Sequence, residues 1–188
     1  MKPLRECRES LVGELLRRPA GADFLEDPLR SLLASMLAGR ALGEGIMSAT
    51  LGLPAADFAK LWDAYFPGPH LRLEDGRTED IPEMSDLIQL FTDYRAESDE
   101  RYAWMARIVA WGCAGRNHLW QDMGFADRRE LSAFMNAAFP ALAALNTGDM
   151  KWKKFIYRHY CQRDGIYVCP APSCGECADY AKCFAPEE

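Results

Sequence analysis

Apolar residues recur at intervals of three and four over most of this chain, and this spacing restricts its fold more than any other feature. The spacing is typical of amphipathic helices, and no run of alternating β-branched residues indicates a strand. Helices are expected at Leu4–Arg17, Pro28–Ala38, Pro54–Tyr65, Pro82–Tyr94, Asp99–Cys113, Arg128–Ala138 and Asp149–Gln162. Three of them open on a proline, which the first turn of a helix tolerates, and Ser98 is the expected cap of the helix that follows it. The sequence therefore predicts an all-α fold, a single helical domain of about seven helices.

The helical period stops near Gly165, where cysteine, proline, glycine and serine follow in close succession. Residues 1–164 are therefore expected to form a helical body, and residues 165–188 a cysteine-rich C-terminal segment that needs a bound group to hold it. Within the body, stretches 38–67 and 114–140 both run from Ala-Gly-Arg through an apolar-Gly-apolar triplet and a helix to Phe-Pro. This similarity indicates either a weak internal repeat or two ordinary helix–turn–helix units that share the same residues at their turns and helix ends.

The composition limits the compartment and the kinds of partner. Apolar residues make up 49% of the chain and charged residues 27%, as in ordinary globular proteins. The apolar runs are too short to span a bilayer and the charged N-terminus does not resemble a secretory signal, so a cytoplasmic protein without a membrane partner is expected. The net charge of −6 argues against a nucleic-acid partner. Five basic residues nevertheless gather before the cysteines, namely Lys151, Lys153, Lys154, Arg158 and Arg163.

Four cysteines near the C-terminus form the chain's clearest chemical motif. Cys169, Cys174, Cys177 and Cys183 follow the spacing C-x4-C-x2-C-x5-C. Disulfides seldom persist in the cytosol, and a structural zinc site commonly uses two short chelating pairs a dozen or more residues apart. Because one winding loop can offer a thiolate to each corner of a compact cluster, the spacing favours an iron–sulfur cluster and leaves a zinc site as the alternative.

Two further side chains are candidate extra metal ligands. His118 lies among polar neighbours and could also contact an oxyanion, and Cys161 lies eight residues before Cys169 on the basic side of its helix. For Cys161 a structural cysteine at a helix end is the simpler interpretation. The remaining candidates are interpreted as structural or surface residues: His159 as a packed, hydrogen-bonded histidine, Cys7 and Cys113 as core, and His70 as solvated. No acid–base pair, phosphate loop or nucleophile elbow indicates an enzyme.

The segments NHLWQDMGF and MKWKKFIYRHYCQRDGIYVCPAPSC, together with the cysteine spacing, resemble the NifQ family of nitrogen-fixation proteins. The resemblance is strongest from about Cys113 to Phe184 and is compatible through Leu51–Pro67. It implies an iron–sulfur protein, with a cluster of the [3Fe-4S] or [4Fe-4S] type, that carries molybdenum as a Mo-Fe-S cluster. It also implies donation of that molybdenum for biosynthesis of the nitrogenase iron–molybdenum cofactor, with the scaffold NifEN acting with NifH as recipient. Carried over by position, the four cysteines are the implied ligands.

Soft thiolate and sulfide donors suit such metals, and molybdate or a molybdenum–sulfur species would be the incoming cargo. One cysteine segment per chain makes a monomeric metal carrier, rather than an enzyme, the simplest expectation. Two alternatives stay open: a helical interaction module with a structural four-cysteine zinc site, and a simple iron–sulfur electron carrier.

Overall fold

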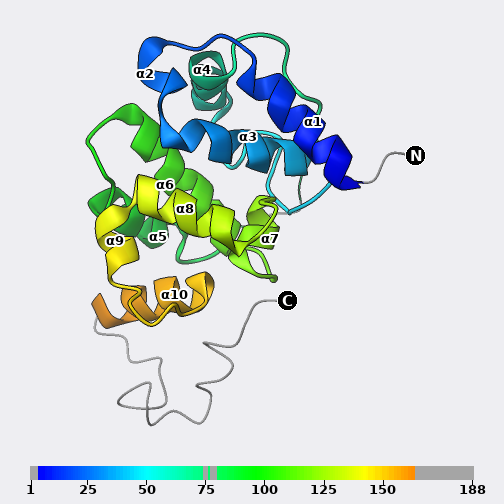
Figure 1. Cartoon of the computed structure of the whole chain (residues 1–188). Coiled ribbons are helices and arrows are strands. Elements are labelled where there is room, and N and C mark those ends of the chain that lie inside the picture. Colours follow the sequence, from blue (N-terminus) through cyan, green and yellow to red (C-terminus); the bar gives the residue numbers. More distant parts are fainter. Residues whose placement is uncertain (1–3, 74–75, 77–79, 164–188) are drawn as a thin grey trace.

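The computed structural model describes residues 4–73, 76 and 80–163, and within these residues every regular element is an α-helix (Figure 1). The bounds are α1 Leu4–Leu16, α2 Ala22–Leu25, α3 Pro28–Ala41, α4 Ala55–Tyr65, α5 Met84–Asp93, α6 Glu100–Cys113, α7 Leu119–Met123, α8 Arg128–Ala138, α9 Pro140–Ala144 and α10 Trp152–Arg163. The predicted all-α domain is therefore confirmed.

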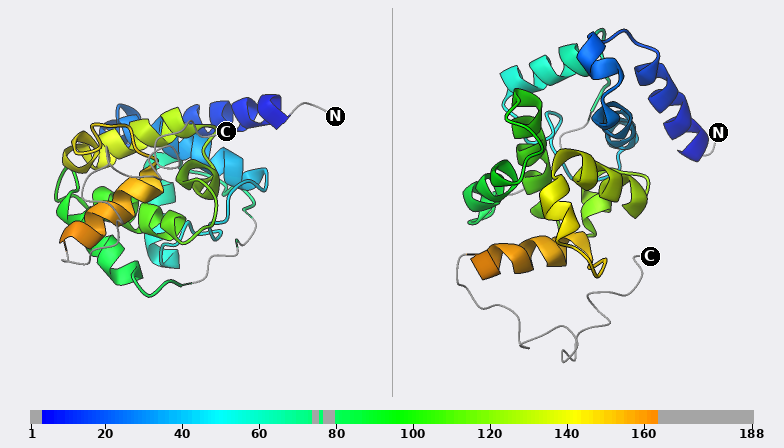
Figure 2. Two further views of the ribbon diagram at one scale, coloured as in Figure 1. Left: turned by 90° about the horizontal axis from the view of Figure 1, so that it is seen from below. Right: turned by 60° about the vertical axis from the view of Figure 1, so that its left-hand side comes forward.

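The helices pack around one continuous apolar core. Helix α1 packs on α3, α3 on α8, and α5 on α6, so the core joins elements from both halves of the sequence. Leu33, Trp62, Phe91 and Phe134 are among its fully buried members. Helices α1, α2 and α4 lie at one end of the body and α10 lies at the other end, in two of the views (Figures 1 and 2). No helix in the described part of the chain has the length and apolar character that a membrane crossing requires.

The seven predicted helices are all present, and three short ones add to them. Helices α2, α7 and α9 have four or five residues, which is too short for a 3.6-residue period to show in the sequence. The cap predicted at Ser98 is wrong. Asp99 takes that position, where its Oδ1 accepts a hydrogen bond of 2.8 Å from the Arg101 N–H, and aspartate is as good a cap as serine.

Local signals at other helix ends explain why the elements begin and stop where they do. Asp27 caps α3 by accepting from the Leu29 N–H at 2.8 Å, and Pro28 occupies the first turn as predicted. Pro54 precedes α4 as its N-cap residue. Helix α7 ends at Gly124, whose φ of 84° lies in the left-handed region that glycine adopts without strain.

Candidate metal centre and its helical support

The four cysteines predicted as cluster ligands, Cys169, Cys174, Cys177 and Cys183, lie outside the described residues. The described element nearest to them in sequence is α10, which ends at Arg163, six residues before Cys169. The contacts of α10 therefore determine where the cysteine segment is attached to the body.

The first half of α10 is held by apolar burial. Phe155 and Ile156 are buried, and Trp152 is buried with its indole Nε1–H donating to Ser132 Oγ at 2.9 Å. The Trp152 and Phe155 rings meet edge to face, an arrangement that aromatic pairs prefer. This half of the helix is thus fixed against α8, from which Ser132 comes.

A buried ion pair joins the same half of α10 to α7. The Lys153 ammonium donates to the Asp122 carboxylate and, at 2.8 Å, to the Gly115 carbonyl oxygen. The Asp122 side chain is fully buried and also accepts from the Asn117 N–H at 3.0 Å and from the Asn117 Nδ2–H at 3.1 Å. Burying a carboxylate is costly unless an ion pair and hydrogen bonds compensate for the lost water, and both are present here. The segments NHLWQD and MKWKK, which carry the family resemblance, therefore meet at this pair.

The close approach of the backbone to this ion pair explains why residue 115 is glycine. A Cβ on residue 115 would overlap the Asp122 carboxylate, so only glycine lets the backbone reach the carboxylate and the ammonium together.

Polar contacts hold the second half of α10 to α5 and to Tyr94, the C-cap residue of α5. Tyr160 OH donates to Asp86 at 2.9 Å, Arg163 donates to Asp93 at 3.1 Å, and His159 Nε2 lies 2.9 Å from Tyr94 OH. Burial, with a smaller effect from the Arg163 charge, lowers the pKa of His159 below its usual value. The prediction that His159 is a packed, hydrogen-bonded histidine is confirmed.

The polar neighbours of His118 have structural roles. His118 is the N-cap residue of α7, and its backbone N–H donates to Gln121 Oε1 at 3.2 Å. Asn117 and Asp122 bond to each other beside it. In the part of the chain that the structure covers, no three His, Cys, Asp or Glu side chains gather as a metal-binding group. A role for His118 as an extra ligand to the cysteine site stays a prediction.

Two cysteines in the described residues are buried in helices. Cys113, at the end of α6, is 3% exposed, and burial raises the pKa of its thiol to about 12, against an opposing effect of Lys153. Because metal binding needs the thiolate, Cys113 is a core residue, as predicted. Cys161 lies in the last turns of α10 and is buried, and its role as a ligand stays a prediction. His70 is exposed, as predicted, and its ring packs 4.6 Å from that of Trp62.

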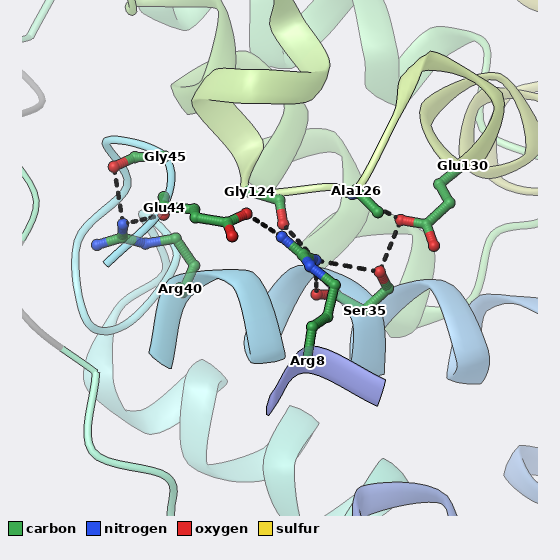
Figure 3. A network of polar contacts seen from close by, with 8 residues as sticks. All are labelled: Arg8, Ser35, Arg40, Glu44, Gly45, Gly124, Ala126 and Glu130. Carbon is green, nitrogen blue, oxygen red and sulfur yellow. Dashed lines mark hydrogen bonds and ion pairs between the residues drawn. The ribbon is translucent and has the colours of Figure 1, made fainter. Parts of the chain in front are cut away.

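A network of buried polar groups, which no sequence pattern indicated, also converges on the end of α7 (Figure 3). Arg8 of α1 donates to the carbonyl oxygens of Ser35 at 2.8 Å and Gly124 at 3.1 Å, and it pairs with Glu44. Glu130 of α8 accepts from Ser35 Oγ at 2.6 Å. An arginine in a strongly charged first helix looks like a surface residue, so the sequence carried no signal for this role.

The class of protein defined by the fold and the sequence is an all-α body whose last described helix leads into a four-cysteine segment. The family model described as NifQ matches residues 32–185, a range that includes all four cysteines. "Protein NifQ" of Azotobacter vinelandii is 37% identical over 152 residues, which cover 73% of this chain and 78% of that protein. "Protein NifQ" of Rhodobacter capsulatus is 36% identical over 162 residues, covering 86% and 90%.

The "Protein NifQ homolog" of Sinorhizobium fredii is 34% identical over 170 residues, covering 88% of this chain and 74% of that protein. No solved structure matches the chain. The chain belongs to the NifQ family of nitrogen-fixation proteins.

Proposed function

We propose that this chain is an iron–sulfur protein that carries molybdenum and donates it for biosynthesis of the nitrogenase iron–molybdenum cofactor. The observation that carries the proposal is membership of the NifQ family over a range that contains the C-x4-C-x2-C-x5-C motif. The chain acts as a cytoplasmic carrier rather than as an enzyme. Its recipient is the assembly scaffold NifEN acting with NifH, and its cargo arrives as molybdate or as a molybdenum–sulfur species.

The ligands in this proposal are Cys169, Cys174, Cys177 and Cys183. Four thiolates are soft donors, which suit an iron–sulfur core and molybdenum in a sulfur environment. One feature of the described residues supports a cluster of this kind. Helix α10, which leads into the cysteines, carries cations and no carboxylate. A thiolate-bound cluster is anionic, so cations on the adjoining helix favour it.

The described residues give the cysteine segment a fixed starting point. Lys153 and Trp152 hold α10 to α7 and α8, and three polar side chains hold its other end to α5 and the residue after it. A carrier needs such an arrangement because the body must stay folded while the cargo leaves. The body keeps its own apolar core, which is built from residues that precede the cysteines.

Metal analysis of protein purified without oxygen from cells supplied with molybdate tests the proposal. Iron together with less than one molybdenum per chain is expected in the unaltered protein, and both should be lost in Cys177→Ala. The matched control is Cys7→Ala, a half-buried cysteine on α1 at the other end of the body, which should keep both metals.

The alternatives give different results in the same experiment. Zinc without iron would overturn the proposal in favour of a helical module with a structural zinc site, and the protein would then be colourless. Iron without molybdenum would support a simple electron carrier instead.

A further inference from the structure

The segment from Met150 to Arg163 differs in charge from the rest of the protein. It contains five lysine or arginine residues and no carboxylate, although the whole chain has a net charge of −6. Most of this segment is α10, at the end of the body opposite α1, α2 and α4 (Figures 1 and 2). A run of cations without any carboxylate therefore lies at one end of an acidic molecule.

The buried pair between Lys153 and Asp122 determines which way the other cations face. It holds one side of α10 against α7, and Ile156 is buried on that inner side. Lys151 and Lys154, one helical turn apart, lie on the side away from Ile156, since successive residues turn by about 100°. Lys154 is exposed and Lys151 is partly exposed.

A third cation comes from another element. Lys153 reaches the carbonyl oxygen of Gly115 at 2.8 Å, which brings the chain between α6 and α7 against the start of α10. Arg116 is the next residue and is exposed. Lys151, Lys154 and Arg116, here called the cationic surface, thus lie at the same end of the body.

The cationic surface is not neutralised within the described part of the chain, where no carboxylate forms an ion pair or hydrogen bond with these three side chains. Some other exposed cations do have such a partner; Lys60, for example, lies 2.6 Å from Glu100. Exposed charges cost little to keep in water, and a group of one sign attracts a partner surface of the opposite sign.

We propose that the cationic surface docks a carboxylate-rich face of a protein partner. The partner's identity as the recipient of the cargo rests on the proposed function, whereas the surface and its chemistry do not. A partner bound here lies at the start of α10, the helix whose other end, at Arg163, leads into the cysteine segment. The complementary charges act mainly by speeding association, which makes the contact fast and sensitive to salt.

The first experiment needs no metal and no natural partner. Fluorescein-labelled poly-L-glutamate is titrated with the full-length protein at 50 and 300 mM NaCl, and anisotropy gives the affinity. The test variant is Lys154→Glu with Arg116→Glu. The matched control is Arg17→Glu with Arg72→Glu, which alters two exposed arginines outside the surface and changes the net charge equally.

The unaltered protein should bind the polymer at 50 mM NaCl despite its net charge, and the test variant should bind about tenfold more weakly or worse. The control should stay within about twofold, and high salt should remove the difference. Equal losses in the two variants would overturn the proposal, because net charge alone would then explain binding. Tighter binding to a DNA duplex of equal charge, lost in the test variant, would overturn it in favour of a nucleic-acid surface.

One outcome separates an external partner from the chain itself. If the unaltered protein ignores the polymer but a Glu176→Gln, Asp179→Asn variant binds it, the C-terminal segment occupies the surface and the proposal falls. The second experiment compares the test variant and the matched control variant for binding to the recipient complex NifEN with NifH. If the test variant loses binding to the polymer but not to that complex, the complex is not the partner of the cationic surface, although the surface itself still binds carboxylates. Metal analysis tests the cargo separately.

Discussion

At the scale of single residues, the pair formed by Lys153 and Asp122 carries the most consequence. The two residues are 31 positions apart in sequence, and the Asp122 side chain is fully buried while that of Lys153 is 18% exposed. Removing one member of a buried pair leaves an unneutralised charge in a place that water reaches poorly. The pair therefore holds α10 to the body and makes the family's two motifs depend on each other.

Lys153→Met is expected to lower the free energy of unfolding by roughly 2–4 kcal/mol, because Asp122 then loses its ammonium partner inside the protein. Urea unfolding followed by circular dichroism measures the change. The matched control is Lys60→Met, which breaks an exposed pair with Glu100 and should cost much less, because water screens an exposed pair. Similar losses in the free energy of unfolding in both variants would show that the buried pair stabilises the protein no more than an exposed pair does.

The two candidate extra ligands are tested one at a time. His118→Ala and Cys161→Ser should both keep iron, because His118 serves the start of α7 through its backbone N–H and Cys161 is buried in α10. Metal analysis of anaerobically purified protein, with Cys177→Ala as the variant that loses iron, gives the answer. Loss of iron in either variant would contradict this expectation. Loss of molybdenum alone would assign that side chain as a molybdenum ligand.

Residue roles were predictable only where local sequence determines them. The packed character of His159 follows from a short-range pattern, the spacing of apolar residues along its helix. The pairing of Asp122 with Lys153, and the burial of Arg8, depend on which elements the fold brings together, so no local pattern carries them. For the same reason no local pattern showed that Asn117, Gln121 and Asp122, the polar neighbours of His118, bond within the protein. The ligand role of His118 itself stays a prediction.

At the scale of elements, helices of ten residues or more were visible in the sequence and helices of five residues or fewer were not. The end of α4 and the end of α8 also share a local geometry: Phe66 and Phe139 have φ of −142° and −139°, and each N–H donates to the carbonyl oxygen four residues earlier. This agrees locally with the sequence similarity between stretches 38–67 and 114–140. The repeat as a whole stays a prediction.

Helix α10 should show a pH-dependent stability through His159. Burial and the Arg163 charge lower the pKa of His159 in the folded protein, so between that lowered value and about 6.5 the unfolded chain binds more protons than the folded one. The free energy of unfolding therefore rises with pH across this window. In His159→Gln, which can still hydrogen-bond to Tyr94, this rise between pH 5 and pH 7.5 should shrink in urea unfolding. An unchanged rise would show that His159 does not cause it.

At the scale of the whole molecule, α7 and Gly124 are the place where the two ends of the body are joined. Arg8 of α1 reaches the Gly124 carbonyl oxygen across 116 positions of sequence, and Lys153 of α10 reaches Asp122 two residues earlier. Between them, Ser35 and Glu130 connect α3 to α8. The helices at opposite ends in Figure 1 are thus held to one short segment.

Arg8→Met tests whether this junction holds the first helix in place. The substitution keeps much of the apolar stem but leaves two buried carbonyl oxygens and the Glu44 carboxylate without their donor. We expect a loss of roughly 2–4 kcal/mol in the free energy of unfolding, with faster hydrogen exchange concentrated in α1 and α3. Arg17→Met, on the exposed side of the same chain segment, should change stability by less than about 0.5 kcal/mol. Because Arg8 pairs with Glu44 while Lys153 pairs with Asp122, exchange in α10 should change less than in α1. Faster exchange spread evenly over all helices would show instead that the body opens as a single unit and that the junction does not hold α1 separately.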